Sequence, residues 1–135
     1  MTAGTVGEFA APTRIVAGRG CVEASLAAEL ASLGVATVAV IADRGFAGTG
    51  QLDALLGVVT GVEVSVCALI DEDPGVAACE VAAERALRAG AEGVLAVGGG
   101  SAMCAAKAVA IRLRNPAPLD RYEGAGRLGA PPAPS

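Results

Sequence analysis

The residues with the clearest chemical potential are a glycine run and the serine after it, in the stretch VLAVGGGSAMCAAK. Gly98, Gly99, Gly100 and Ser101 separate an apolar run from an alanine-rich segment, where a strand is expected to pass into a helix. Glycine lets the backbone approach a ligand that a Cβ would repel. The helix that follows points free N–H groups and its positive dipole end at the same spot. This arrangement suits a phosphate, and Ser101 can either cap the helix or donate its hydroxyl to a phosphate oxygen.

A purely structural role for the glycine run is equally compatible with the local sequence. Tight connections between packed elements use glycine routinely. The run also matches neither the G-x-G-x-x-G pattern nor the Walker A pattern. On these residues alone, phosphate binding and a simple tight turn both stay open.

The chain of 135 residues contains no histidine. This excludes a Ser-His or Cys-His catalytic pair and every metal site that needs an imidazole ligand. The cysteines Cys21, Cys67, Cys79 and Cys104 lie far apart, without a C-x-x-C pair. We therefore expect small, buried thiols in a reducing compartment, rather than a disulfide framework or a zinc site.

Composition narrows the remaining classes of protein. The length allows one domain with a core but not two. Hydrophobic residues make up 53% and aromatic residues only 2%, so the core must consist of aliphatic side chains. The net charge of -4 argues against a nucleic-acid surface, which needs clustered Lys and Arg. Because we find neither a long apolar run nor a basic start followed by an apolar stretch, we expect no membrane helix, no secretory signal and a cytoplasmic location.

Apolar periodicity predicts strands that alternate with helices. Continuous apolar runs such as ATVAVIAD are typical of parallel strands covered on both faces. Asp73 is expected to be the N-cap of a helix with Pro74 at its first position, and Gly34 and Gly90 are expected to end helices. The pattern predicts an α/β domain with a largely parallel sheet. The expected strands are 13–18, 36–43, 62–70 and 92–97, and the expected helices are 21–34, 51–59, 73–90 and 101–113.

Three blocks of the sequence resemble the N-terminal domain of the iron-containing alcohol dehydrogenase family. They occur in the family's order and cover roughly residues 9–124. The most specific piece is the family pattern G-G-G-S-x-x-D-x-A-K, which residues 98–107 follow except at Cys104. The related dehydroquinate synthase-like enzymes share the glycine run, but the serine and the Ala-Lys ending favour the alcohol dehydrogenase branch. The blocks are FAAPTRIVAGRGCVEASLAAELASLG, VAVIADRGFAGTGQLDAL and DEDPGVAACEVAAERALRAGAEGVLAVGGGSAMCAAKAVAI.

The resemblance implies roles for individual positions. Residues 98–101 correspond to the loop that holds the pyrophosphate of a dinucleotide. Asp43 corresponds to the acid that binds the adenine ribose hydroxyls, where a carboxylate repels a 2′-phosphate and favours NAD over NADP, with NADP still possible. A plain turn or cap role for Asp43 stays open. Asp73 and Pro74 stand where the family often has Asn-Pro near the cofactor, and an N-cap explains Asp73 equally well.

The sequence departs from the family pattern in two respects. Cys104 replaces an aspartate that lies close to the nicotinamide end of the site in the family. Cys104 is therefore a candidate cofactor-binding residue, as a thiolate whose pKa the helix start lowers. In the other interpretation, Cys104 is a small buried side chain that fills space in the core. The family's metal is held by one Asp and three His in a helical C-terminal domain that this chain does not contain. The resemblance therefore implies no metal ligand and no catalytic residue here, and iron or zinc only in a complete family member.

The resemblance implies a Rossmann-like, doubly wound α/β fold and the role of the NAD(P)-binding half of an iron-containing alcohol dehydrogenase-like oxidoreductase. In the complete enzyme, a hydride would pass between the nicotinamide cofactor and a small alcohol, aldehyde or ketone. Two alternatives stay open: a non-catalytic nucleotide-binding module or pseudoenzyme, and a subunit completed by another chain. A homodimer is also possible. We expect the dinucleotide-binding domain at residues 1–124 and a Pro- and Gly-rich linker or truncated end at residues 125–135.

Overall fold

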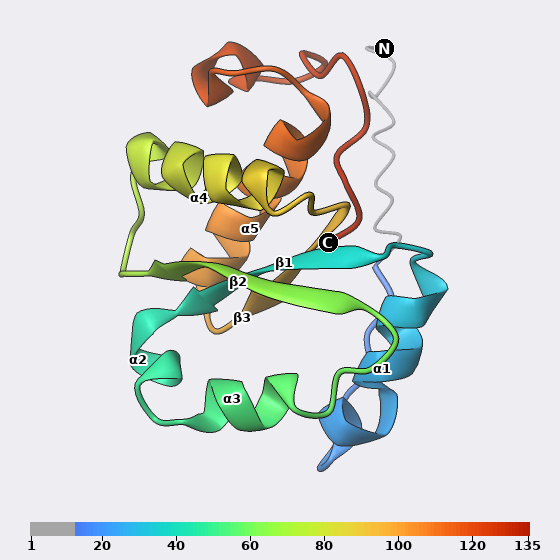
Figure 1. The fold of residues 1–135 in the computed structure, drawn as a ribbon. Coiled ribbons are helices and arrows are strands. Elements are labelled where there is room, and N and C mark those ends of the chain that lie inside the picture. Colours follow the sequence, from blue (N-terminus) through green and yellow to red (C-terminus); the bar gives the residue numbers. More distant parts are fainter. Residues whose placement is uncertain (1–12) are drawn as a thin grey trace, which may run out of the picture.

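The computed structural model describes residues 13–135, which form a parallel three-stranded sheet with helices on both faces (Figure 1). The strands are β1 (Thr37–Asp43), β2 (Glu63–Ile70) and β3 (Gly93–Val97), in the order β2-β1-β3. β1 pairs in parallel with both neighbours. The prediction of a doubly wound α/β domain with a parallel sheet is confirmed. Residues 9–12, which open the block that carries the family resemblance, lie outside the described residues.

The central strand β1 is the most buried part of the molecule. Its residues 38–42 have no solvent-accessible surface, because they are apolar on both faces and lie between two helical layers. β2 lies at the sheet edge, where Val66 is 50% exposed. The carboxyl end of β1 is therefore held rigidly, and any side chain at that end is placed by the core behind it.

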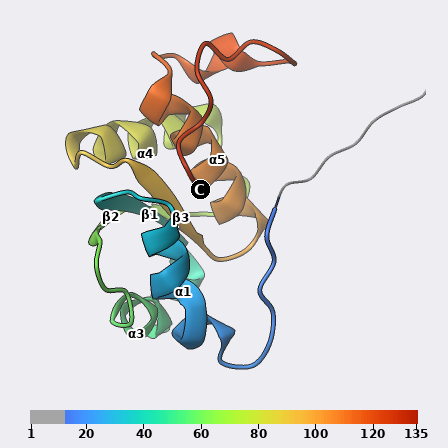
Figure 2. The same cartoon turned by 90° about the vertical axis from the view of Figure 1, so that its right-hand side faces the viewer.

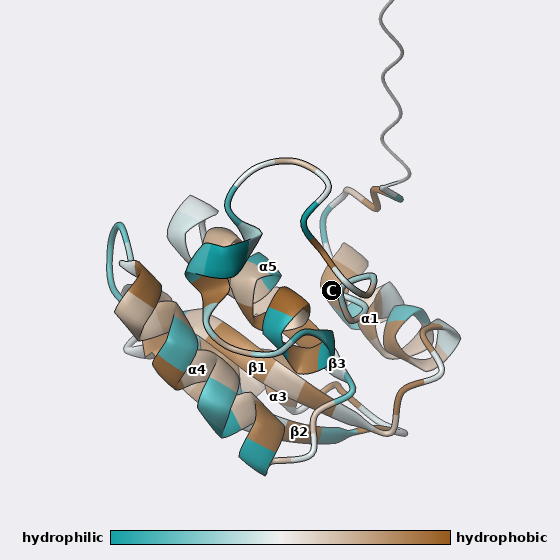
Figure 3. Ribbon diagram, turned by 90° about the horizontal axis from the view of Figure 1, so that it is seen from above, coloured by the Kyte–Doolittle hydropathy of each residue, from teal (hydrophilic) through white to brown (hydrophobic). Residues whose placement is uncertain are grey.

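The helices divide between the two faces of the sheet, as Figures 1 and 2 show. One face carries α1 (Cys21–Ser32), α2 (Arg44–Ala47) and α3 (Gln51–Leu56). The other carries α4 (Val76–Arg88) and α5 (Gly100–Arg114), which lie side by side over the sheet (Figure 3). Small side chains allow this close approach of α4, α5 and the sheet. No helix within residues 13–135 combines the length and the apolar character needed to cross a membrane. The buried alanines of this layer are Ala82, Ala83, Ala86, Ala105, Ala106 and Ala110.

The strand predicted at residues 13–18 is wrong. These residues join no strand of the sheet, and Ile15 is 82% exposed. A β-branched run becomes a strand only where another strand offers hydrogen-bonding partners, and the local pattern does not report such a partner. The helix predicted after it is present as α1, in which Leu30 is buried, whereas Val22 and Leu33 are each 40% exposed.

The predicted start of α4 is also wrong. The helix begins at Val76 after Gly75 as N-cap, without a side-chain cap hydrogen bond. Asp73 has a φ of 51°, in the left-handed region, and its N–H donates to the hydroxyl of Ser101 at 3.1 Å. This contact with a distant residue takes Asp73 out of the helix. The predicted end of α4 is confirmed, since Gly90 adopts a φ of 69° directly after the helix.

The C-terminal residues pack back onto α5 and β3. Ala133 is buried, and its N–H donates to a carbonyl of α5 at 2.9 Å. The carbonyl of Pro134 accepts a 2.8 Å hydrogen bond from the N–H of Val94 on β3. The buried side chain of Asn115 bonds the backbone of residues 129–130 through both its oxygen and its nitrogen. The division at residue 124 stays a prediction, although Ala133 and Pro134 beyond it bond to α5 and β3.

Candidate nucleotide site at the ends of strands β1 and β3

The chain leaves the neighbouring strands β1 and β3 toward opposite faces of the sheet. After β1 it enters α2 and α3 on one face, and after β3 it enters α5 on the other (Figure 1). In open α/β sheets, ligands bind outside the carboxyl ends of the strands at such a switch point. Asp43 is the last residue of β1, and the glycine run follows directly after β3. Two features that the sequence singled out therefore lie at this point.

Asp43 and the first glycine of the run are in direct contact. A Cβ on Gly98 would lie 2.5 Å from the Cβ of Asp43 and 3.3 Å from that of Ala102. Gly98 also has a φ of 140°, which side chains rarely tolerate. Glycine is thus required here for close packing, and this packing holds the loop against the end of β1.

The next two glycines leave the start of α5 open. Gly99 is the N-cap, with no side-chain cap hydrogen bond, and Gly100 is the first helical residue. A Cβ on either would meet no atom within 4 Å. Because the first N–H groups of a helix lack intrahelical acceptors, this loop presents donors and a positive dipole end to open space. These are the properties that a pyrophosphate needs.

Ser101 does not cap α5, since it is the second residue of the helix. Its hydroxyl oxygen instead accepts the N–H of Asp73 at 3.1 Å. This bond joins the β2–α4 loop to the glycine run. A hydroxyl that accepts one hydrogen bond still has its own proton to donate, so the role of donor to a phosphate oxygen is compatible with this geometry.

Asp43 caps the short helix α2. Its Oδ1 accepts the N–H of Phe46 at 2.9 Å. The cap role considered in the sequence analysis is thus present, while ribose binding stays a prediction. The two roles are compatible, because a carboxylate accepts several hydrogen bonds and the Oδ2 atom is not used by the cap.

An ion pair that sequence reasoning missed lies beside Asp43. The Nε of Arg44 is 2.7 Å from Oδ1 of Asp71, and its Nη2 donates to the carbonyl of Leu69 at 3.1 Å. The hydrogen bond to Asp71 raises the pKa of Arg44, and the hydrogen bond from Arg44 lowers the pKa of Asp71. Both groups are therefore charged at neutral pH. The available signal was an arginine directly after the strand-end acid and an acidic run, Asp-Glu-Asp, after the next strand.

A hollow of about 370 Å³ adjoins the glycine run between the starts of α4 and α5. It brings together four predicted site residues, namely Asp73, Gly100, Ser101 and Cys104. Cys104 is exposed, so its interpretation as a buried filler is wrong. Cys79 also lines the hollow and is buried, and burial, followed by the nearby Cys104 thiol, raises the pKa of Cys79. Of the other cysteines, Cys67 is buried as expected, whereas Cys21 is only half-buried.

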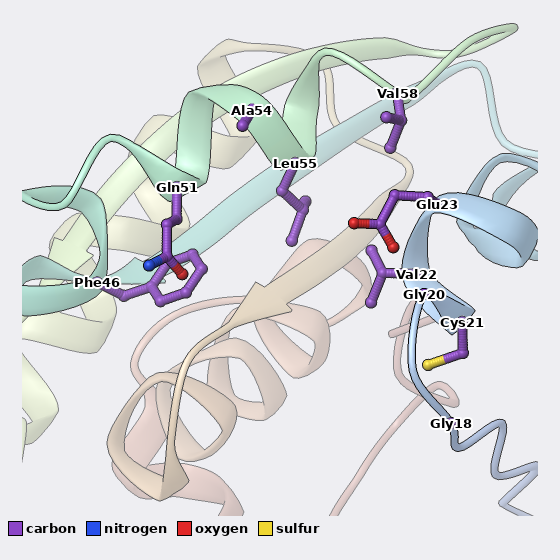
Figure 4. Close-up of a pocket in the computed structure, with 10 residues that line it drawn as sticks. All are labelled: Gly18, Gly20, Cys21, Val22, Glu23, Phe46, Gln51, Ala54, Leu55 and Val58. Carbon is purple, nitrogen blue, oxygen red and sulfur yellow. The ribbon is translucent and has the colours of Figure 1, made fainter.

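A second hollow, of about 290 Å³, lies on the opposite face between α1 and the α2–α3 segment (Figure 4). Phe46, Leu55 and Val22 point into it, and Glu23 is the charged side chain on its wall. It contains none of the predicted site residues. We therefore place the candidate site at the switch point and not in this hollow. The sequence analysis did not predict the hollow.

The donors of this chain do not match the metal that the family resemblance implies for a complete member. Within the part of the chain that the structure describes, no group of three or more Cys, Asp or Glu side chains is placed to hold a metal ion. The sequence also has no histidine to supply imidazole ligands.

Comparison with known proteins identifies the family. The family model of iron-containing alcohol dehydrogenases matches residues 12–135. The chain belongs to this family. The resemblance seen in the sequence is thus confirmed over nearly the whole chain.

Solved structures of iron-containing alcohol dehydrogenases and related enzymes share the fold. NADH-dependent butanol dehydrogenase A from Thermotoga maritima is 27% identical over 96% of this chain, with a TM-score of 0.83. Sulfoacetaldehyde reductase from Bifidobacterium kashiwanohense, solved in complex with NAD+, is 27% identical over 91% of this chain, with a TM-score of 0.79. The chain spans 33% and 32% of these two proteins, respectively. The comparison with curated proteins returned no match.

Proposed function

We propose that this chain is the dinucleotide-binding part of an iron-containing alcohol dehydrogenase-type oxidoreductase, and that it binds NAD at the switch point. One observation carries the proposal: the contact between Asp43 and Gly98 puts a strand-end acid directly beside the open start of α5. The NAD+ complex of the sulfoacetaldehyde reductase and the NADH dependence of the butanol dehydrogenase support it.

Each part of the site matches one part of the dinucleotide. The N–H groups at Gly99 and Gly100 and the hydroxyl of Ser101 would donate to the pyrophosphate oxygens. The Asp43 carboxylate would accept hydrogen bonds from both ribose hydroxyls, and its charge would disfavour the additional phosphate of NADP. Cys104 and Asp73, on the wall of the adjoining hollow, would border the bound cofactor.

In a complete enzyme of this type, the cofactor accepts or donates a hydride, and the partner substrate is a small alcohol, aldehyde or ketone. The share of this chain in that reaction is to bind and orient the cofactor. The metal that would polarise the substrate oxygen needs ligands from outside these residues, in a helical domain of the same protein or in another chain.

A non-catalytic nucleotide-binding module is the second candidate function. Both functions share the same binding step and differ in whether a metal-binding half joins it. We further propose a cytoplasmic location and no nucleic-acid or membrane partner.

Calorimetric titration of the 135-residue chain with NAD tests the proposal, with Gly99→Val as the decisive variant. Gly99 has a φ of -87° and open space around its Cβ position, so valine is compatible with the fold but fills the phosphate position. We expect at least about a tenfold loss of affinity. Gly75→Val is the matched control, because Gly75 is the N-cap of α4 with a similar φ of -72° and equally open surroundings.

Unchanged NAD affinity in Gly99→Val would show that the loop is only a structural connection. An equal loss in Gly75→Val would show that the effect comes from any N-cap substitution at this edge of the sheet. Either result contradicts the assignment of the pyrophosphate to residues 98–101.

A further inference from the structure

We infer that Asp71 is a positioning residue for cofactor choice: by holding Arg44 on the β2 side of the sheet, it keeps this cation away from the ribose and favours NAD over NADP. This inference rests on the proposed function, because it concerns the adenosine ribose expected beside Asp43.

Arg44 is, by its position, the residue that could reverse the preference set by Asp43. It directly follows that acid and is the first residue of α2. A guanidinium presents donors in a planar fork that matches a phosphate. In dinucleotide-binding folds, an arginine near the ribose accommodates the 2′-phosphate of NADP. A free Arg44 would therefore work against the charge of Asp43.

The structure holds Arg44 on the side of β1 away from the glycine run. Its Nε lies 2.7 Å from Oδ1 of Asp71, and its Nη2 lies 3.3 Å from Oδ2 and 3.1 Å from the carbonyl of Leu69. Leu69 belongs to β2, and Asp71 is the first residue after this strand. β2 and β3 flank β1 on opposite sides. The fork of Arg44 is thus engaged at the β2 end, while the pyrophosphate loop follows β3.

The net charge at this edge of the sheet adds to the effect. The loop after β2 carries three consecutive acids, Asp71, Glu72 and Asp73, and Asp43 ends β1. Arg44 is the basic residue among them, and its charge is compensated by Asp71 at contact distance. The uncompensated charge near the ribose is therefore negative, which disfavours a dianionic phosphate. Removing Asp71 would change both the position of Arg44 and the local charge, so the test must separate the two.

The experiment measures the dissociation constants of NAD and NADP for the full chain and its variants by calorimetry. In Asp71→Asn, which keeps the shape but loses the charge, we expect the affinity for NADP relative to NAD to rise about two- to fivefold, the range for an exposed ion pair. Glu72→Gln is the matched control, since it removes the same charge from the next residue and leaves the pair intact. Asp71→Glu should keep the original ratio, because the longer carboxylate can still pair with Arg44.

The double variant Asp71→Asn with Arg44→Ala identifies the cause. We expect the relative gain for NADP to disappear, because the released guanidinium is then missing. If the relative gain in NADP affinity persists in the double variant, or is equally large in Glu72→Gln, the inference is overturned. The gain would then come from a general effect of the lost negative charge. If Asp71→Asn still binds NAD and its ratio of NADP to NAD affinity is unchanged, the inference is overturned, but the proposed function is not. No detectable binding of NAD to the unaltered chain would instead overturn the proposed function, and the inference with it.

Discussion

Gly98 and Asp43 pack so closely that a Cβ on Gly98 would lie 2.5 Å from the Cβ of Asp43. This contact joins the carboxyl ends of two neighbouring strands and sets the distance between the acid and the start of α5. The fold and the candidate site thus depend on the same contact. Substitutions within the glycine run can therefore separate stability from binding.

Gly98→Ala is expected to lower the free energy of unfolding by roughly 2 to 4 kcal/mol, because it adds backbone strain at a φ of 140° to a steric clash. Urea denaturation measures the loss. Gly100→Ala is the control: it lies two residues away in open surroundings, and at the first position of a helix it should leave stability within about 1 kcal/mol. Equal stability of the two variants would show that the contact with Asp43 is not tight in solution.

Asp43 has a cap role and a proposed ribose role, which two variants can distinguish. Asp43→Asn keeps an oxygen that can accept the N–H of Phe46, so stability should change little, while loss of the charge should raise NADP affinity relative to NAD by about tenfold, or about 1.4 kcal/mol. Asp43→Ala should show the same cofactor effect and in addition lose about 1 kcal/mol of stability. A ratio of NADP to NAD affinity that stays constant in both variants would place the ribose elsewhere.

Glu80 is expected to make the stability of the fold depend on pH. Its carboxylate accepts hydrogen bonds from Arg112, at 2.8 Å, and from the N–H of Leu119. Burial raises the pKa of Glu80, but these hydrogen bonds outweigh burial and bring the pKa below its ordinary value of 4.5. Because the folded-state pKa is depressed, the stabilisation is complete above pH 4.5 and is lost as the pH falls through the folded-state pKa.

Glu80→Gln should therefore destabilise the chain at neutral pH by about 2 kcal/mol, less than for a fully buried pair because Glu80 is partly exposed. It should also reduce the fall in stability on acidification. Urea midpoints at about pH 7 and about pH 4 measure both effects. Glu84→Gln, at an exposed position on the same helix, is the control. If Glu80→Gln loses stability on acidification as steeply as the unaltered chain, another carboxylate determines the pH dependence of stability.

Cys104 provides a chemical report on the site. It is exposed, whereas Cys79 beside it is buried and has a raised pKa, so a maleimide should label Cys104 first. Because Cys104 lines the hollow next to Ser101, saturating NAD should slow this labelling several-fold. Mass spectrometry of digested protein locates the label, and Cys104→Ser is the blank. Labelling at the same rate with and without NAD would remove the hollow from the dinucleotide site.

The sequence predicted the sheet well because its strands are locally distinctive. Continuous apolar runs after glycine-ended helices indicated β1 and β3 to within one residue, since parallel strands buried on both faces have this composition. Residues 13–18 have β-branched side chains as well, but Ile15 and Val16 lie exposed without a strand beside them. Strand formation depends on a partner elsewhere in the chain, and periodicity carries no information about that partner.

The candidate site was predictable as a set of residues but not as a set of contacts. The position of Asp43 at a strand end and the glycine run at a strand–helix junction followed from local pattern and family resemblance. The bond from Asp73 to Ser101 and the pair of Arg44 with Asp71 join residues 27 or more positions apart. Such contacts arise from the strand order, which a single sequence does not report.

The strand order also determines when the candidate nucleotide site can form. β1 and β2 are neighbours both in sequence and in the sheet, whereas β3 reaches the other side of β1 only after α4 has been made. Until then, one edge of the most buried strand has no hydrogen-bonding partner, and Asp43 has no glycine loop beside it. Because β3 follows β1 and β2 along the chain, it is also the last of the three strands to be synthesised. A bound dinucleotide would thus stabilise only the finished sheet and leave its partly folded precursors unaffected.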